Sequence, residues 1–267
     1  MKFTKIIITR PQKQNLKLQK RLAEIFLAHQ IDVPVVSLPL IEIVPIDQEG
    51  LAESVQRALL QAKWVSFVSP NAFLMCDQLF KKHDLKWPNH LHIAVVGGGS
   101  EQSIIDSGVS FKEIVKPADS TAWDSEGLWQ ALQNTQTDWK DCRMVMIHGE
   151  GGRNFLLEHL KQAGAHIEEF SVYQRQALSL DHPAWKLVDP TQTSLWVFNS
   201  SQAGDFLATR LLELGIDSQF LIHDKAIVSH PRILAKVEQL GFGSVDMIEP
   251  GDEELIKTLL HLYKTAL

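Results

Sequence analysis

Residues 143–175, RMVMIHGEGGRNFLLEHLKQAGAHIEEFSVYQR, are the stretch that decides the fold of this chain. The apolar run MVMI predicts a short buried strand, which the glycine-rich HGEGGR ends. A helical pattern with leucines on one side begins at Asn154, and Gly164 ends it, as a glycine after a helix commonly does. Alternating residues then lead into VYQR. A strand, a glycine turn and a helix N-terminus form a ready anion site, because free amide groups and the helix dipole point outward together.

The same alternation of apolar strands and amphipathic helices runs through the rest of the chain. Further strands are predicted at residues 5–9, 31–36, 40–44, 64–68, 91–96, 111–115, 194–198, 225–228 and 245–248. Further helices are predicted at residues 16–28, 50–62, 73–83, 125–132, 203–214 and 253–263, with shorter ones ending at Ser107 and Gly241. Residues 134–141 and 179–193 are predicted as polar connections. Strands that alternate with helices indicate an α/β fold with mainly parallel sheets.

Two parts of the sequence repeat each other. SFVSPNAF, which contains Ser69, resembles WVFNSSQAG, which contains Ser200, since each is a strand followed by serine and a helix start. Gly97 follows Ser69 by 28 residues and Ser229 follows Ser200 by 29, and each precedes another helix. IIITRP near the start likewise mirrors VMIHGEGGR. Two copies of one α/β unit are the simplest account of these matched pieces.

The order of the repeated pieces predicts that one domain is inserted into the other. The first strand–helix piece precedes the rest of its copy, whereas its twin follows the rest of the other copy. We therefore expect domain 1 to comprise residues 1–35 plus 179–267, and domain 2 to comprise residues 45–168. Residues 36–44 and 169–178 would form a two-stranded linker, which acts as a hinge over a cleft between the domains.

Composition and charge limit the classes of partner. The chain has 267 residues, 45% of them hydrophobic and 22% charged, which is typical of a globular protein with ample core. Its formal net charge of −6 argues against nucleic acid as a partner. No apolar run approaches the length that spans a bilayer, so we expect no membrane partner. Cys76 and Cys142 lie far apart without a CxxC motif, which favours a reducing, cytoplasmic location.

Three common kinds of site are disfavoured by the residues. The eleven histidines form no metal-ligand pattern, so no metal is expected. Neither cysteine has a base near it in the sequence that would activate it as a nucleophile. The glycines that begin at Gly97 lack the full GxGxxG spacing and the acidic ribose-binding residue, which disfavours a dinucleotide cofactor.

Several segments together resemble the uroporphyrinogen-III synthase family. They are ITRP, FVSPNAF, the Gly-x-x-Ser turn at Gly97, GEGGRNFLLEHLKQAGAHIEEFSVYQR, FNSSQA and VSHPRI. The resemblance covers the whole chain in order, and its most specific part is residues 149–175. It implies two Rossmann-like or flavodoxin-like parallel-sheet domains, joined by a two-stranded β linker, with the substrate in the cleft between them.

The resemblance also implies a reaction. The family comprises lyases that cyclise the linear tetrapyrrole hydroxymethylbilane to uroporphyrinogen III in haem and sirohaem biosynthesis, with inversion of ring D and loss of water. It implies no cofactor, a monomer, and transient handover of the substrate from hydroxymethylbilane synthase. Because the free bilane closes without inversion, the enzyme must mainly impose a conformation and shield a reactive cation from water. The eight substrate carboxylates need donors, which helix N-termini and loop amides supply.

Tyr173 matches the family's tyrosine beside the cleft, where its hydroxyl would assist the departure of water; the alternative is a structural tyrosine. Ser69 and Ser200 would bind substrate carboxylates, cap their helices, or do both. Ser100 stands where the family usually has threonine, so the hydroxyl is kept. Glu101 follows it where a small residue is usual, and its negative charge would oppose a polyanion.

Three arginines complete the candidate substrate-binding residues. Arg232 stands in the second copy where Ser100 stands in the first, and would grip a carboxylate with two hydrogen bonds or lie in solvent. Arg10 belongs to the ITRP segment and would contact substrate in the cleft. Arg153 would bind a carboxylate at the glycine turn, or pair with Glu150 or Glu158.

The sequence is also compatible with two other functions. The first is a two-lobed sensor that closes on a tetrapyrrole or another anion without chemistry, since the fold alone does not exclude it. The second is a degenerate family member that regulates genes, which would normally carry an added DNA-binding segment that the sequence does not show.

Overall fold

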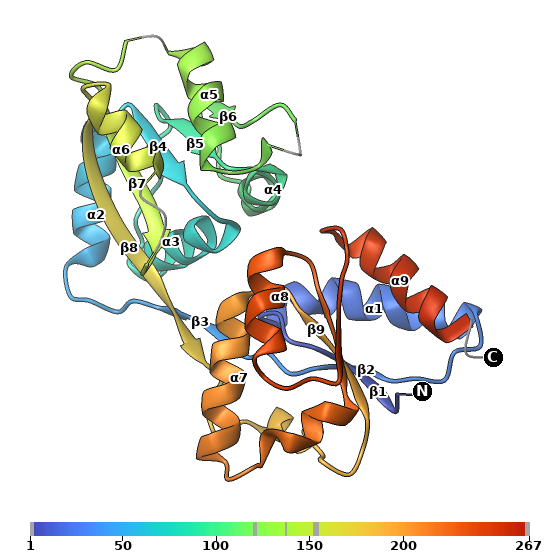
Figure 1. The fold of residues 1–267 in the computed structure, drawn as a ribbon. Helices are drawn as coiled ribbons and strands as arrows, with labels where there is room; N and C mark the ends of the chain where they lie inside the picture. Colours follow the sequence, from blue (N-terminus) through green and yellow to red (C-terminus); the bar gives the residue numbers. More distant parts are fainter. Residues whose placement is uncertain (1–2, 120–121, 137, 152–154, 265–267) are drawn as a thin grey trace. The chain divides into compact units, whose positions relative to one another are not determined.

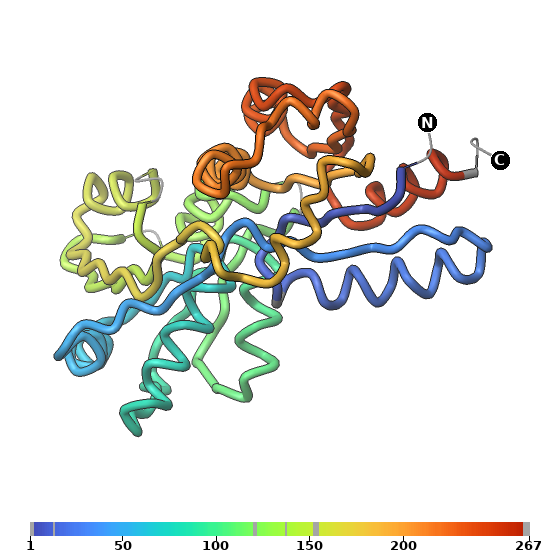
Figure 2. Tube along the Cα trace, turned by 90° about the horizontal axis from the view of Figure 1, so that it is seen from below, coloured from blue at the N-terminus to red at the C-terminus, as the bar shows by residue number. Residues whose placement is uncertain are grey.

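The computed structural model describes residues 3–119, 122–136, 138–151 and 155–264 (Figure 1). The chain divides into two compact units: Met1–Glu42 with Gln176–Leu267 form unit 1, and Ile43–Arg175 form unit 2. Both boundaries fall inside strands, β3 (Ile41–Pro45) and β8 (His166–Ala177), which are hydrogen-bonded neighbours. In Figure 2 the chain passes from unit 1 to unit 2 along β3, drawn in blue, and returns along β8, drawn in yellow.

Unit 1 is built on a five-stranded sheet with the order β11-β10-β9-β1-β2, in which every pair of neighbours is parallel. Its strands are β1 (Lys5–Ile8), β2 (Val35–Ser37), β9 (Ser194–Phe198), β10 (Lys225–Val228) and β11 (Ser244–Met247). Its helices are α1 (Gln12–Ala28), α7 (Ser201–Glu213), α8 (Pro231–Glu238) and α9 (Asp252–Lys264), with short 3-10 helices at η2 (Pro183–Leu187) and η3 (Ser218–His223).

Alternating strand residues of unit 1 face opposite layers of helices. Ile6 and Ile8 of β1 pack with Leu22 of α1 and Leu259 of α9 in one buried cluster. On the opposite face, α7 contacts β9 and α8 contacts β10, and Trp196 of β9 packs edge-to-face with a phenylalanine that follows α8. The sheet is therefore covered on both faces, as its nearly continuous apolar strands require.

Unit 2 has a six-stranded sheet with the order β3-β8-β7-β4-β5-β6. Its remaining strands are β4 (Trp64–Phe67), β5 (His92–Val95), β6 (Glu113–Val115) and β7 (Arg143–Gly149). Its helices are α2 (Leu51–Gln61), α3 (Pro70–Lys82), α4 (Gly98–Ser107), α5 (Ser125–Thr135) and α6 (Phe155–Gln162).

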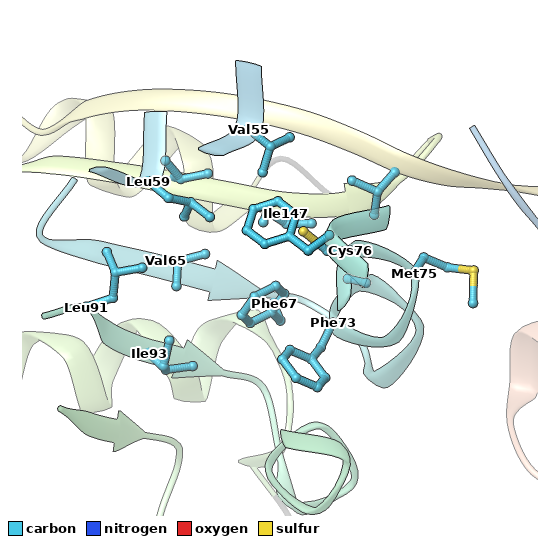
Figure 3. Packing of buried hydrophobic residues seen from close by; sticks show 14 of the residues in the cluster. Val55, Leu59, Val65, Phe67, Phe73, Met75, Cys76, Leu91, Ile93 and Ile147 are labelled. Atoms are coloured by element: carbon cyan, nitrogen blue, oxygen red, sulfur yellow. The ribbon is translucent and has the colours of Figure 1, made fainter. Parts of the chain in front are cut away.

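The sheet of unit 2 also carries helices on both faces. Val65 and Phe67 of β4 join residues of α2, α3 and α4 in the larger buried cluster, part of which Figure 3 shows. Their neighbour Trp64 points to the other face and packs with leucines of α5 and α6, such as Leu132 and Leu160. Both faces are thus apolar, which explains why the sequence shows unbroken hydrophobic runs in these strands.

The two sheets use equivalent strands in the same order. Strands β11-β10-β9-β1-β2 of unit 1 correspond in turn to β6-β5-β4-β7-β8 of unit 2, and each matched helix follows its matched strand. The prediction of an α/β fold with parallel sheets is confirmed. In the part of the chain that the structure describes, no helix combines the length and apolar character needed to cross a bilayer.

The structure differs from the sequence interpretation at several element ends. Helix α1 begins at Gln12 rather than at residue 16, and α5 extends to Thr135, into the expected polar connection. Two connections differ more. A strand was expected from residue 31, but β2 starts at Val35, because the amide of Ile31 donates to Phe26 and closes the end of α1. Pro34 then has no amide hydrogen to add to a ladder. The expected polar connection at 179–193 contains a 3-10 helix, capped by His182, that buries Trp185.

Candidate active site

A pocket of about 440 Å³ lies at the carboxyl ends of the strands of unit 2. The chain leaves the sheet in opposite directions at this place, since β4 leads to β5 whereas β7 leads to β8 on the other side. Ligands of open parallel sheets bind at such a switch point. The residues that line the pocket follow β4 and β5, lie in β7, β8, α5 and α6, or lie in the loops before α5 and after β7: Val68, Ser69, Val96, Trp123, Asp124, Ser125, Met146, His148, Gly149, Gly151, Leu156, Leu157, Glu169, Tyr173 and Arg175.

Three side chains of the pocket are linked through the hydroxyl of Tyr173. The Tyr173 hydroxyl lies 3.1 Å from Ser69 Oγ, and Arg175 Nη2 donates to it over 3.4 Å. Ser69 also accepts a hydrogen bond of 3.1 Å from the amide of Ala72 and so caps α3. The structure thus brings together the serine and the tyrosine that the sequence singled out, and adds Arg175 to them.

The ring of Tyr173 is fixed before any ligand binds. The residue is 1% exposed and belongs to the larger core cluster of unit 2. A Cβ atom at Gly149 would lie only 2.3 Å from Tyr173 Cζ, so the ring needs a glycine on the neighbouring strand. The register of β7 and β8 shifts between His148 and Gly149, which brings Gly149 opposite Tyr173. Core packing therefore positions the ring and leaves its hydroxyl at the pocket.

Ionisable groups of both signs line the same pocket. His148 Nε2 lies 3.6 Å from Glu169 Oε2, and Lys161 Nζ lies 3.6 Å from the other oxygen of the same carboxylate. Asp124 caps α5 by accepting a 2.8 Å hydrogen bond from the amide of Gly127. The lining therefore holds two carboxylates as well as Arg175 and His148, so it is no simple anion trap.

Unit 1 has a counterpart of this pocket at its own switch point, between β1 and β9. There Arg10 donates to Asn199 Oδ1 and to Asp252 Oδ1, each over 2.7 Å. The remaining hollow measures about 10 Å³. Strand registers make Arg10 the counterpart of His148, because Ile8 pairs with Val197 as Met146 pairs with Ser66. One unit thus closes its switch point with an arginine, whereas the other keeps it open.

The other candidates of unit 1 do not line this small hollow. Ser200 precedes α7 as its N-cap residue, and its hydroxyl makes no capping bond within that described helix. Arg232 is exposed at the start of α8, where its backbone amide donates to His230 Nδ1 over 3.1 Å. The structure therefore brings neither residue to Arg10 at the switch point.

Ser100 lies inside the first turn of α4 rather than on the pocket lining. It is 1% exposed, and its Oγ has no hydrogen-bond partner among the described residues. Glu101 beside it forms an ion pair with Lys116, which offsets the negative charge that would oppose a polyanion. The interpretation that Arg232 is the counterpart of Ser100 was wrong by one position, because the strand registers match Ser100 with the buried Ile233.

Among the described residues, neither the buried cysteine of unit 2 nor any metal-ligand cluster adds to this pocket. Arg153 lies outside the described residues. Cys76 is fully buried in the core, where desolvation raises the pKa of its thiol well above its usual range, so it holds little nucleophilic thiolate. No group of three potential metal-ligating side chains occurs within the described ranges.

Comparison with known proteins identifies the family of this chain. A family model described as uroporphyrinogen-III synthase HemD matches residues 20–257. The chain belongs to the uroporphyrinogen-III synthase family. Members of this family are lyases that cyclise hydroxymethylbilane with inversion of ring D and loss of water, in porphyrin and haem biosynthesis, and this is the function of the chain.

Solved structures of this family share its fold. A uroporphyrinogen-III synthetase from Helicobacter pylori is 14% identical, with a TM-score of 0.61, over 97% of this chain and 99% of that chain. A mutant uroporphyrinogen III synthase from the extremely thermophilic bacterium Thermus thermophilus is 12% identical, with a TM-score of 0.54, over 98% of each chain. No curated protein sequence matches the chain. At these identities the structural likeness concerns the two-domain fold, and the family model carries the assignment of function.

The sequence did not single out His148, Glu169 or Trp123 of the pocket lining. His148 could have been found, because aligning the two repeats strand by strand matches it with Arg10 of the other unit. Glu169 and Trp123 carry no local signal. They reach the pocket from β8 and from the loop before α5, through contacts that spacing along the chain does not reveal.

Proposed function

We propose that the pocket of unit 2 binds the pyrrole that carries the hydroxymethyl group, and that Tyr173 donates a hydrogen bond to the departing hydroxyl. The observation that carries this proposal is the pair of hydroxyls, Tyr173 and Ser69, 3.1 Å apart on the lining of the pocket. The pocket holds about 440 Å³, which suits part of a tetrapyrrole rather than all of it.

Counting protons shows why the pair is suited to this role. Each hydroxyl brings one proton, and the bond between Tyr173 and Ser69 uses only one of the two. Ser69 accepts from Ala72 and Tyr173 accepts from Arg175, so these two neighbours consume neither proton. One O–H is left to donate toward the pocket, and Arg175 polarises the tyrosine oxygen from the other side. Such a donor assists loss of water as the C–O bond breaks.

Binding of the carboxylates is assigned to the remaining candidates by their chemistry. In unit 2 they are Arg175, the amides of the glycine turn, Ser100 and Arg153. In unit 1 they are Arg10, Ser200 and Arg232, where Arg10 would exchange its bonds to Asn199 and Asp252 for a substrate carboxylate. Helix N-termini add donors without making the surface basic.

The main contribution of the protein is conformational. Closure of the free bilane without inversion needs no enzyme, so the protein must hold ring D where its substituted carbon meets the reactive methylene. Walls such as Val68, Leu156 and Leu157 exclude water that would otherwise capture the cation. We assign the protein to the cytoplasm as a monomer that takes its substrate from hydroxymethylbilane synthase, because the family shares this pathway and the sequence has few cysteines.

A coupled assay tests the proposal. Hydroxymethylbilane is generated in situ, the products are oxidised, and type I and type III isomers are separated by chromatography. We expect an excess of the type III isomer that depends on this protein and falls with substitutions at Tyr173. Type I isomer alone, with tight tetrapyrrole binding, would indicate a sensor without catalysis. Type I isomer without binding would contradict the proposed site and its chemistry together.

A further inference from the structure

Trp123 is a large aromatic side chain that lines the pocket although the proposed chemistry does not use it. The residue is 47% exposed, which is unusual for tryptophan, and lies in the loop before α5. Its indole rests on the backbone at the start of α4. Cβ atoms at Gly97 and Gly98 would lie 2.8 Å from Trp123 Cδ2 and 2.7 Å from Cη2. The two glycines therefore seat the indole, while the rest of its surface stays accessible.

The charges beside Trp123 determine which kind of ligand group would bind to the exposed face of its indole. Asp124 follows it directly, and Glu169 lines the same pocket with a side chain that is 36% exposed. Carboxylates repel the acetate and propionate arms of the substrate and attract a cation. An indole face also attracts cations, through the negative potential above its ring. The indole and the adjacent carboxylate of Asp124 thus offer two attractive groups to a cation. Glu169 adds a second carboxylate to the same lining, where it also lies 3.6 Å from His148 and from Lys161.

The reaction produces a matching cation. The hydroxymethyl group takes up one proton, its C–O bond breaks, and one water leaves. The lone pair of the pyrrole nitrogen then forms a C=N double bond within the ring, and the methylene carbon becomes doubly bonded to the ring. The product is an azafulvenium cation, which carries the positive charge that the proton brought. The cation is flat and delocalised, which is the shape that stacks on an aromatic side chain.

We infer that Trp123 is the aromatic surface on which the reacting pyrrole stacks, and that it stabilises the azafulvenium cation by a cation–π interaction. The inference rests on the proposed function of the pocket. Contact with Gly97 and Gly98 holds the indole in place before the cation forms, so the side chain needs little reorganisation during the reaction. Because the charge arises only after binding, the interaction acts on kcat more than on KM.

Replacing the aromatic ring tests this inference. Trp123→Leu keeps an apolar side chain without a π face, and we expect kcat to fall about 5–30-fold with KM changed less than about twofold. Trp123→Phe keeps a smaller aromatic face and should retain kcat within about threefold of the wild type. Thermal unfolding shows whether each variant is folded. A Trp123→Leu variant with wild-type kcat and a normal type III fraction would overturn the inference.

A pair of glycine substitutions tests whether the position of the indole matters, because both variants keep the tryptophan. Gly98→Ala displaces the ring, since the added Cβ would meet Cη2 at 2.7 Å, whereas Gly99→Ala meets only Pro70 Cγ at 3.4 Å. Alanine favours the helix at both places, so neither substitution should unfold α4. We expect Gly98→Ala to lower kcat as Trp123→Leu does, and Gly99→Ala to leave it unchanged.

The outcomes separate the two proposals. Equal kcat in the two glycine variants would contradict the role of the seated indole. Wild-type protein that forms no type III isomer would overturn the proposed function, and this inference with it. Wild-type activity that survives in Trp123→Leu would overturn the inference alone.

Discussion

The Tyr173 hydroxyl is the single group on which the proposed chemistry depends most. Tyr173→Phe removes that oxygen while the ring keeps its place over Gly149 in the core. We expect kcat to fall about 10–100-fold, because a donor at the leaving group is lost. The melting temperature should change by only a few degrees. Initial rates at saturating substrate and a thermal melt check both statements, and a wild-type rate would remove Tyr173 from the chemistry.

Gly149 is the second decisive residue, because it makes room for that ring. An alanine Cβ at this position would lie 2.3 Å from Tyr173 Cζ, and the ring has no free space in a cluster where it is 1% exposed. We expect Gly149→Ala to lower the free energy of unfolding by about 1–3 kcal/mol and to impair turnover as well. Urea unfolding measures the first effect. Gly99→Ala is the control, and equal stability of the two variants would contradict the prediction.

Helix α9 buries a tyrosine near its C-terminal end. Tyr263 packs edge-to-face on Phe26 and is 7% exposed, but its hydroxyl has no hydrogen-bond partner among the described residues. A buried hydroxyl without a partner costs stability. We therefore expect Tyr263→Phe to raise the free energy of unfolding by up to about 1 kcal/mol at neutral pH, measured by urea unfolding. A clear loss of stability would reveal a partner of the hydroxyl.

The same substitution has a pH dependence of defined sign. Burial raises the pKa of Tyr263 from 10.0 to about 12. Between these values the unfolded wild type loses the phenol proton while the folded state keeps it, so the wild type loses stability as pH rises through this range. Tyr263→Phe lacks this loss, and its advantage should widen from about pH 9 to about pH 12. An advantage that stays constant would contradict the raised pKa.

The elements themselves were largely predictable, because local rules decide them. Apolar runs marked the strands, and Ser69 and Ser200 marked the starts of α3 and α7. What failed depends on distant contacts. The burial of Ser100 follows from how α4 lies on its sheet, and the bonds of Arg10 to Asn199 and Asp252 join residues about 190 and 240 positions away. Trp123 meets Gly97 only because the chain returns there after β6.

The two units have separate cores and differ in chain connectivity. Unit 2 is continuous in sequence, has a hydrophobic cluster on each face of its sheet, and contains the pocket that Tyr173 lines. Unit 1 is assembled from two segments of the chain that meet where β1 lies between β2 and β9. A continuous segment with its own core is expected to fold without the rest of the chain.

Residues 41–177, which retain β3 and β8 in full, should therefore fold as an independent protein. We expect a cooperative urea transition with coincident fluorescence and circular-dichroism curves, since both clusters are complete in this segment. Val65→Asp is the matched control, because a carboxylate at this fully buried position of β4 should abolish the transition. The segment lacks Arg10, Ser200 and Arg232, so we expect no type III isomer from it. A segment without a cooperative transition would show that unit 2 needs unit 1 to fold, and a segment with full activity would exclude the three residues of unit 1 from catalysis.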